Sequence, residues 1–228
     1  MHHISLNRRL VAELLGTALL LAVVVGSGIM GEKLSGGNVA LALLANSLAT
    51  GVGLFALIQI FAPISGAHFN PVVSLYAAME KHISWQEAGM YAVIQIVGAV
   101  LGVLAAHLMF AVPLFEISQH VRAGGAQWWS EFVATFGLLA VIISTSRSNH
   151  LTTPAAVAAY ITSAYWFTAS TSFANPAVTL ARTLTATFAG IRPCDSLGFI
   201  VMQIIGAVAA VVVFRWLLKP LDATIKSV

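Results

Sequence analysis

Two copies of an Asn-Pro pair carry the clearest chemical signal in the sequence. The first copy reads Asn70-Pro71-Val72 and the second reads Asn175-Pro176-Ala177. Asparagine is a favoured N-cap, and proline suits the first helical position because its missing N–H would be unpaired there anyway. Each copy therefore predicts a short helix whose N-terminus presents N–H groups and the positive end of the helix dipole. In an apolar chain such helix ends belong where they line a cavity or are buried in protein.

The composition indicates which environment these helices must be built in. The chain has 228 residues, of which 59% are hydrophobic and 8% are charged, and its mean hydropathy is +0.91. A soluble domain carries about 25% charged residues, so we predict an integral membrane protein whose partner is the lipid bilayer. The net charge of +3 comes from scattered basic residues, which does not favour nucleic acid as a partner. The single cysteine, Cys194, excludes an internal disulfide.

Spanning a bilayer as a helix takes about 20 apolar residues. Six stretches are this long or nearly so: Leu10–Met30, Val39–Phe61, Trp85–Val112, Trp129–Thr145, Thr153–Thr168 and Leu197–Leu218. Two apolar pieces that begin at the Asn-Pro pairs are too short to span, Pro71–Met79 and Pro176–Phe188. We predict an all-α membrane protein with six transmembrane helices plus two half-helices, in a single domain over residues 1–228.

Three landmarks recur in the same order and at nearly constant spacing in the two halves of the chain. The pairs are Glu13 with Glu131, Asn70 with Asn175, and Gln95 with Gln203. The repeats cover about residues 8–112 and 127–219. Since each half holds three spanning helices, an odd number, the halves must enter the membrane with opposite orientation. Inverted three-helix repeats with broken helices place a solute path at the midplane.

The distribution of positive charge predicts the orientation of the chain. An even number of spans places both termini on one side of the membrane. That side would carry Arg8, Arg9, Lys81, Arg147, Arg215, Lys219 and Lys226, and the other would carry Lys33, Arg122, Arg182 and Arg192. Because positive charge collects on the cytoplasmic side, we expect a multi-pass protein of the inner (plasma) membrane with both termini in the cytoplasm.

Two carboxylates fall inside apolar helices, Glu13 and Glu131. Such acids suggest a function by default. However, each half also contains an irregular loop before its Asn-Pro pair, and the N–H groups of that loop need acceptors that a carboxylate can supply. We therefore interpret both acids as braces for the loops, with Gln95 and Gln203 either serving the same scaffold or bonding across helices. His68 either lines the cytoplasmic mouth or only hydrogen-bonds the loop.

The two Asn-Pro boxes, with the repeated Glu and Gln residues around them, resemble the aquaporin and aquaglyceroporin family over the whole chain. The resemblance implies a right-handed bundle of six tilted helices, with two half-helices that meet at the middle. It also implies a homotetramer with one pore in each subunit. Asn70 and Asn175 would offer amide donors to a passing solute. The pore centre would comprise Asn70, Pro71, Val72, Asn175, Pro176 and Ala177.

The sequence departs from this family at the outer constriction. The residue directly after the second box is usually an arginine, and here it is Val178. By distance from the boxes, the other filter positions fall on Thr50, Ser163 and Ser172, although the aromatic cluster at residues 165–167 leaves the register of Ser163 open. None of these four residues has an aromatic ring or a fixed charge, so we predict a wide, weakly polar filter.

A filter without its cation lacks a steric block and part of an electrostatic barrier. We expect uncharged solutes larger than water to pass, with some tolerance for anions. Valine at this position resembles a bacterial branch linked to arsenic resistance, which suggests arsenite, antimonite or methylated arsenicals besides glycerol and water. Arg182 shares a helix face with Val178 and leans toward it. It either restores a charge at the outer mouth or snorkels at the surface.

Other readings remain open. An ordinary water and glycerol facilitator without a metalloid role is the nearest alternative. A secondary transporter would need a coupling-ion site, and we find no intramembrane acid without a bracing role. A membrane enzyme is not favoured, because the sequence shows no metal-binding cluster, no nucleophile with its base and no phosphate loop. We therefore expect no catalysis, cofactor or metal. Two intact asparagines argue against a non-conducting structural tetramer.

Overall fold

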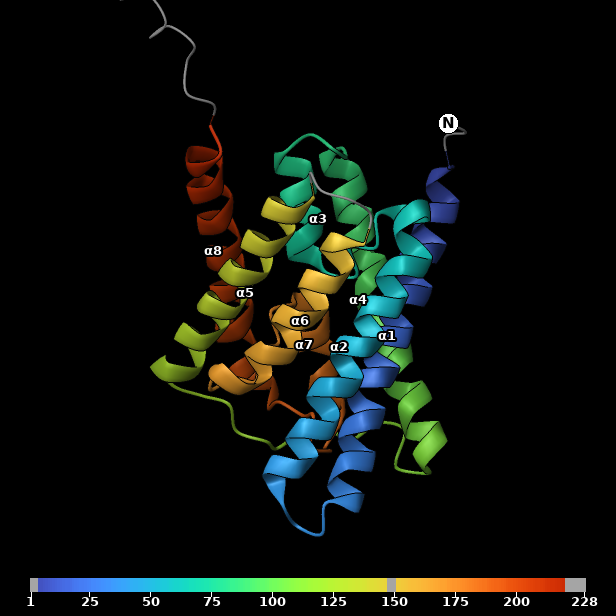
Figure 1. Cartoon of the computed structure of the whole chain (residues 1–228). Helices are drawn as coiled ribbons and strands as arrows, with labels where there is room; N and C mark the ends of the chain where they lie inside the picture. Colours follow the sequence, from blue (N-terminus) through green and yellow to red (C-terminus); the bar gives the residue numbers. More distant parts are fainter. Residues whose placement is uncertain (1–3, 147–150, 220–228) are drawn as a thin grey trace, which may run out of the picture.

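The computed structural model describes residues 4–146 and 151–219, and this part of the chain is helical with no strand. The predicted all-α architecture is confirmed (Figure 1). The elements are α1 Leu6–Leu34, α2 Val39–Ser65, α3 Pro71–Met79, α4 Trp85–Phe110, α5 Gly125–Thr145, α6 Thr152–Phe167, α7 Pro176–Ala181, the 3-10 helix η1 Arg182–Leu184, and α8 Pro193–Leu217.

Five helices of the described chain, α1, α2, α4, α5 and α8, are long and apolar enough to cross a membrane. They have 21 to 29 residues. Helix α1 is longer at both ends than the predicted Leu10–Met30, because its helical hydrogen bonding continues through the polar residues that flank the apolar run. Helix α6 has 16 residues, or about 24 Å of helix, and lies against α2 and α5.

The two Asn-Pro pairs start the two short helices as predicted, but the second short helix ends early. Helix α3 has the expected bounds, whereas α7 stops at Ala181 instead of Phe188 and continues as η1. Local hydrogen bonds compete with the helix here, because the Thr183 hydroxyl donates to the Leu180 carbonyl at 2.7 Å. The Thr183 carbonyl in turn accepts from the Ser118 N–H of the α4–α5 loop at 2.9 Å. The predicted half-helix over 176–188 was therefore too long.

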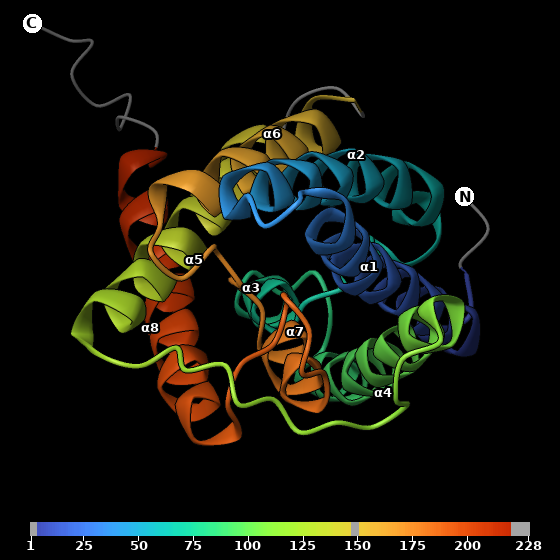
Figure 2. The same ribbon diagram turned by 90° about the horizontal axis from the view of Figure 1, so that it is seen from below.

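The long helices surround the short ones. Figure 2 shows α1, α2, α4, α5, α6 and α8 as a ring with α3 and α7 in its middle. In Figure 1, α3 lies nearer the end of the molecule that carries the N-terminus, and α7 lies nearer the opposite end. Helix α1 packs on α2 and α4, and α5 packs on α6 and α8. The same pairing thus occurs in both halves of the chain.

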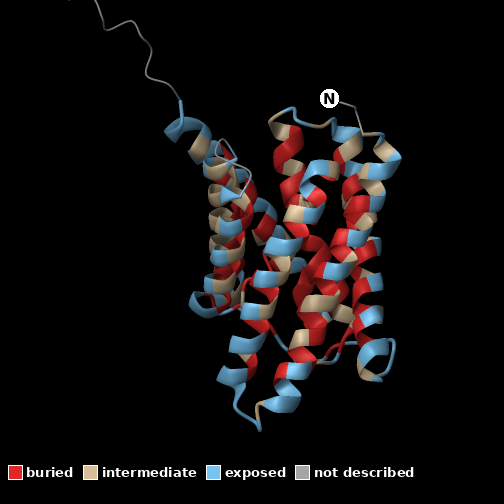
Figure 3. Cartoon of the chain, turned by 45° about the vertical axis from the view of Figure 1, so that its right-hand side comes forward, coloured by how far each residue is buried: buried red, intermediate tan, exposed pale blue. Residues whose placement is uncertain are grey.

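Burial separates an inner from an outer surface of the ring (Figure 3). Buried side chains face the middle, while large apolar side chains such as Val52, Val93 and Leu108 are 63% to 70% exposed on the outside. Apolar exposure of this extent marks a surface that contacts lipid or another protein. The outside of the bundle is therefore suited to a bilayer.

Two glycines at equivalent positions let the helices of each half approach closely. A Cβ on Gly98 of α4 would lie 2.5 Å from the Leu14 carbonyl oxygen of α1. A Cβ on Gly206 of α8 would lie 2.6 Å from the Phe132 carbonyl oxygen of α5. These distances are shorter than van der Waals contact, and the obstructing atoms are backbone, which cannot rotate away. The α1–α4 and α5–α8 pairs therefore each depend on a missing side chain.

We expect Gly98→Ala to separate α1 from α4 and to lower the stability of the folded protein by about 1–3 kcal/mol. Thermal unfolding of the purified protein in detergent measures this effect. Gly89→Ala on the same helix is the matched control, since a Cβ there meets no atom within 4 Å. Equal melting temperatures for the two variants would contradict the close-packing assignment.

Candidate functional site

The side chains of Asn70 and Asn175 cap the two short helices. The Asn70 Oδ1 accepts from the Val72 N–H at 3.1 Å. The Asn175 Oδ1 accepts from the N–H groups of Ala177 at 2.9 Å and Val178 at 3.3 Å. The N-caps predicted from the sequence are thus confirmed, and they fix the orientation of both amides.

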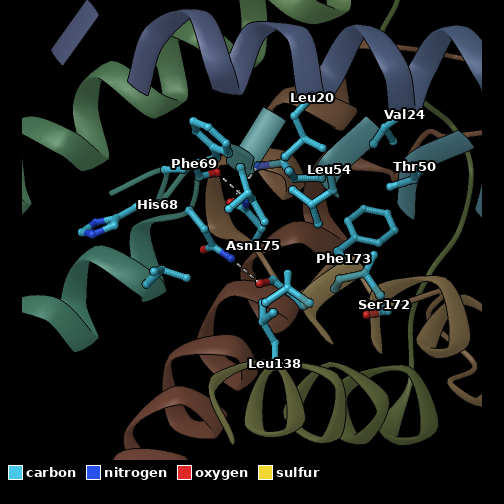
Figure 4. Close-up of a pocket in the computed structure, with 18 of the residues that line it drawn as sticks. Leu20, Val24, Thr50, Leu54, His68, Phe69, Leu138, Ser172, Phe173 and Asn175 are labelled. Atoms are coloured by element: carbon cyan, nitrogen blue, oxygen red, sulfur yellow. Dashed lines mark hydrogen bonds between the residues drawn. The ribbon is translucent and has the colours of Figure 1, made fainter. Parts of the chain in front are cut away.

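The amide nitrogens of the same two residues join the halves of the protein. Asn70 Nδ2 donates to the Ala174 carbonyl and Asn175 Nδ2 donates to the Phe69 carbonyl, each at 2.8 Å. Figure 4 draws these bonds as dashed lines beside the cavity. A primary amide has two N–H donors, and each asparagine uses one of them in this exchange. One donor per asparagine is left for a solute in the cavity.

The loop before each asparagine is held in an unusual backbone conformation. Ala67 and Phe69 have φ values of 51° and 50°, and Ser172 and Ala174 have φ values of 52° and 49°. Positive φ is costly for residues with a Cβ and persists only where the surroundings impose it. Equivalent positions of the two halves have nearly the same positive φ values, so the same kind of constraint shapes both loops.

That constraint includes the two buried glutamates. Glu13 accepts from the N–H groups of His68 at 3.0 Å and Phe69 at 2.7 Å, from the Ser65 hydroxyl at 2.6 Å and from Gln95 Nε2 at 2.8 Å. These are the contacts expected of a loop brace. Such bonding occupies the lone pairs of the carboxylate and leaves little capacity for a transported ion.

The second half repeats this arrangement. Glu131 accepts from the N–H groups of Phe173 at 2.9 Å and Ala174 at 2.8 Å, and from Gln203 Nε2 at 2.6 Å. Gln203 Nε2 also donates to the hydroxyl of Thr179 on α7 at 2.9 Å, as Gln95 Nε2 does to Ser74 on α3 at 3.1 Å. Each glutamine therefore connects its glutamate to the neighbouring short helix.

A cavity of about 130 Å³ runs past the tips of the two short helices. In Figure 4, His68 lies at one end, Asn175 near the middle, and Thr50 and Ser172 at the other end. Seven of the candidate residues are brought together in its wall: Thr50, His68, Asn70, Ser172, Asn175, Val178 and Arg182. The braces lie behind the wall.

Four residues predicted at the pore centre do not line the cavity. They are Pro71, Val72, Pro176 and Ala177. The prolines occupy the first helical positions, and the residues after them supply the N–H groups that the asparagines cap. Their role is to start the helices at the right place, so only the asparagine of each box reaches the cavity.

His68 lies at the cavity wall, and its side chain contacts a helix instead of the loop. Its Nδ1 lies 3.0 Å from the Ser74 hydroxyl of α3. Its ring also packs on Tyr91, with the ring centroids 5.2 Å apart. The histidine is therefore fixed between α3 and α4 at one end of the cavity.

The expected filter position on α6 was wrong. Ser163 is exposed, its hydroxyl donates to the Tyr160 carbonyl at 2.8 Å, and it does not line the cavity. Tyr165 does line the cavity, and its hydroxyl donates to Thr50 Oγ1 at 3.2 Å. The aromatic cluster at residues 165–167 was the signal for this shift. With Phe173 also in the wall, the expectation of an end without aromatic rings is not met.

Arg122 supports the site from outside the cavity wall, and the sequence did not single it out for this role. It lies in the loop between α4 and α5, and its side chain donates to the carbonyls of Gly190 at 2.9 Å and Ser170 at 3.2 Å. Its guanidinium carbon is 5.1 Å from the centroid of the Phe173 ring. Burial lowers the pKa of Arg122 to about 10, which leaves it protonated at neutral pH. Arg122 therefore fixes the loop that precedes the second asparagine.

Comparison with known proteins identifies this arrangement. The sequence matches the family model described as "Major intrinsic protein" over residues 1–167. The chain belongs to the major intrinsic protein family. Major intrinsic proteins of the aquaglyceroporin type are channels and not enzymes, so this protein is a multi-pass membrane channel.

Individual relatives agree with the family. The chain is 51% identical to the aquaglyceroporin AqpS of Rhizobium meliloti (strain 1021), over 100% of this chain and 97% of the relative. It is 34% identical to a probable aquaporin TIP1-2 of Oryza sativa subsp. japonica, over 63% of this chain and 59% of the relative. The X-ray structure of the aquaglyceroporin from Plasmodium falciparum superimposes with a TM-score of 0.72 at 23% identity, covering 93% and 95% of the two chains.

Replacing a brace of this channel should release its loop. Glu131→Gln puts an amide donor beside the N–H groups of Phe173 and Ala174, and leaving such buried donors unpaired costs about 1–3 kcal/mol. We expect a lower melting temperature and faster proteolysis in the loop at 168–175. Glu32→Gln, at an exposed glutamate, serves as the control. If the Glu131→Gln variant is as stable as the control, Glu131 does not brace the loop.

The assignment of Tyr165 in place of Ser163 can also be tested. Because Tyr165 fills part of the cavity wall, Tyr165→Leu should widen it and raise glycerol permeability relative to water by about twofold or more. Ser163→Ala, on the same helix, should change neither rate. Light scattering from vesicles that contain each variant measures both. A larger effect of Ser163→Ala than of Tyr165→Leu would restore the original assignment.

Proposed function

We propose that each subunit is a passive pore for small uncharged solutes, namely water, glycerol and neutral metalloid hydroxides such as arsenite as As(OH)3. The observation that carries this proposal is the cavity that joins the paired asparagines to Thr50, Ser172 and Val178. The name of the relative from Rhizobium meliloti, an aquaglyceroporin, supports the glycerol and water part. The metalloid part rests on Val178, which occupies the position after the second Asn-Pro-Ala box.

The chemistry of the wall suits such solutes. Most of the cavity is lined by aliphatic side chains, among them Leu20, Leu54 and Leu138. The polar groups of the wall include amide donors at the middle, the hydroxyl groups of Thr50 and Ser172 at one end, and His68 at the other end. A solute with several hydroxyl groups can exchange water for these groups while its remaining surface contacts the aliphatic wall. A solute that lacks hydrogen-bonding groups gains nothing from them.

Charge should decide which solutes are excluded. Both short helices direct their N-termini toward the middle of the cavity, and these ends carry partial positive charge. No carboxylate lines the cavity in the described part of the chain. A cation at the middle would therefore lose hydration without meeting an opposite charge, whereas a neutral solute would not face this barrier.

A coupled transporter is less well supported than a passive pore. It would need an ion site, and the two intramembrane glutamates are occupied by loop N–H groups and glutamine amides.

We further propose that the protein is a homotetramer in the inner (plasma) membrane with both termini in the cytoplasm. The apolar outer surface supports an assembly within lipid, and the larger number of basic residues on the side of the termini supports the orientation.

Val178→Arg tests the proposed width of the pore. The substitution adds a bulky donor to the cavity wall that Thr50 also lines, so we expect glycerol and arsenite permeability to fall at least about tenfold and water permeability to fall less. Stopped-flow light scattering from proteoliposomes gives the glycerol and water rates, and arsenite uptake is measured in the same vesicles.

Val178→Ile is the control, because it keeps an uncharged branched side chain of similar shape. It should retain glycerol and arsenite passage. If the arginine variant stays folded and all three rates match the wild type, Val178 does not limit the pore. If the wild type passes water but not glycerol or arsenite, the protein is a water channel and the proposed solute class is wrong.

A further inference from the structure

Arg182 is a buried cation with unused hydrogen-bonding capacity. Its side chain lines the cavity, and the residue is 2% exposed. The Nε donates to the Ala189 carbonyl, and the guanidinium carbon lies 3.4 Å from the centroid of the Phe173 ring. The two terminal nitrogens have no hydrogen bond to any described residue. Four N–H donors are therefore free on a side chain at the cavity wall.

No acid in the described chain is paired with this arginine. The three ion pairs there are Arg9 with Glu87, Arg192 with Asp195 and Arg215 with Glu80. The nearby Arg122 is positive and cannot compensate this charge. Burial and the positive charges of Arg122 and Arg182 lower the pKa of His120, which disfavours a further positive charge there. An unpaired buried charge is strongly destabilising, so this one indicates a role outside structural stability.

A second unpaired polar group lines the same cavity. The Ser172 hydroxyl oxygen is buried without a hydrogen-bond partner in the described chain. Thr50 Oγ1 accepts from the Tyr165 hydroxyl at 3.2 Å, which leaves its own proton free to donate. Figure 4 shows Thr50, Ser172 and Phe173 together at the end of the cavity opposite His68. The hydroxyl groups of Ser172 and Thr50 can complete their hydrogen bonds when oxygen-bearing molecules occupy that end of the cavity.

We propose that Arg182, held on the face of Phe173, is the selectivity cation of the pore and contacts solute oxygens together with Ser172 and Thr50. This inference rests on the proposed pore. It assigns two tasks to Arg182: repelling cations, including the hydrated proton, and donating hydrogen bonds to the hydroxyl or oxo groups of polyols and neutral oxyacids. Phe173 is a positioning residue, because its ring face holds the guanidinium by a cation–π contact.

In this pore the positive charge and the residue after the second box belong to different side chains, Arg182 and Val178. Arg182 follows Val178 by four residues, about 6 Å along the helix axis. The guanidinium is bound to the Ala189 carbonyl and to the face of the Phe173 ring, so the charge acts on solutes near Ser172 and Thr50, while Val178 remains a small uncharged side chain. A pore built in this way can reject cations and still admit solutes bulkier than water.

Arg182→Met tests the proposal, because methionine keeps much of the volume and contact with Phe173 but removes the charge and donors. Proton flux is measured in proteoliposomes with a trapped pH-sensitive dye and a potassium diffusion potential. Water and glycerol rates are measured by light scattering. We expect proton flux per channel to rise about tenfold or more, and glycerol permeability relative to water to fall about threefold or more as its donors are lost.

Arg192→Met is the matched control. It removes a positive charge from an arginine that is 37% exposed, does not line the cavity and pairs with Asp195. It should leave proton, water and glycerol rates at wild-type values. If Arg182→Met keeps the control's rates, Arg182 is a structural residue and the proposal is overturned. A rise in proton flux in both variants would overturn it as well.

A wild-type measurement keeps the proposal testable if Arg182→Met fails to fold. The wild-type channel must exclude protons even though Val178 replaces an arginine at the filter, and a proton flux that rises with water permeability would refute the role of Arg182. This result is separate from the proposed solute class. If the wild type passes glycerol but conducts protons, only the role of Arg182 as selectivity cation is refuted. If it excludes both protons and glycerol, the proposed solute class is refuted.

Discussion

The structure depends on two reciprocal hydrogen bonds at its centre. Asn70 donates to the carbonyl of Ala174 and Asn175 donates to the carbonyl of Phe69, both at 2.8 Å. Each bond joins one half of the chain to the other, so neither loop can move without breaking a contact made by its counterpart. Because each asparagine also caps its own helix, one side chain fixes the helix start, the junction of the halves and the direction of the remaining amide donor.

The buried glutamates are needed because of that junction. Bringing two helix tips together forces the preceding loops through positive φ values, which leaves their N–H groups without helical or sheet partners. In hydrocarbon each such group would cost several kcal/mol. Glu13 and Glu131 accept these donors from behind the cavity wall. An acid in a membrane helix usually suggests ion or proton movement, but here its lone pairs are used by the backbone.

The sequence predicts local features of this fold well. It predicts poorly which side chains of one element face another element. The Asn-Pro pairs predict both helix starts because capping and proline geometry are properties of adjacent residues. The repeat of Glu and Gln identifies the braces because each loop needs an acceptor in its own half. Tyr165 was missed in favour of Ser163, since a count of residues from the box does not determine how α6 is rotated. The early end of α7 depends on a contact with the α4–α5 loop, which lies far away in the sequence.

Arg182 shows why the charge of the cavity wall cannot be predicted from the residue after the second box alone. Valine after the second box predicts a filter without fixed charge. Thr50, Ser172 and Val178 are uncharged, but Arg182 lines the same cavity, so the prediction of an uncharged wall is not met. The guanidinium enters the wall from the next turn of the chain, on the ring of a residue that belongs to the strained loop. Phe173 is set by Glu131, which accepts its N–H. The brace, the loop and the charge thus form one connected unit, so electrostatic selection at the proposed pore depends on the same carboxylate that holds the second helix tip in place.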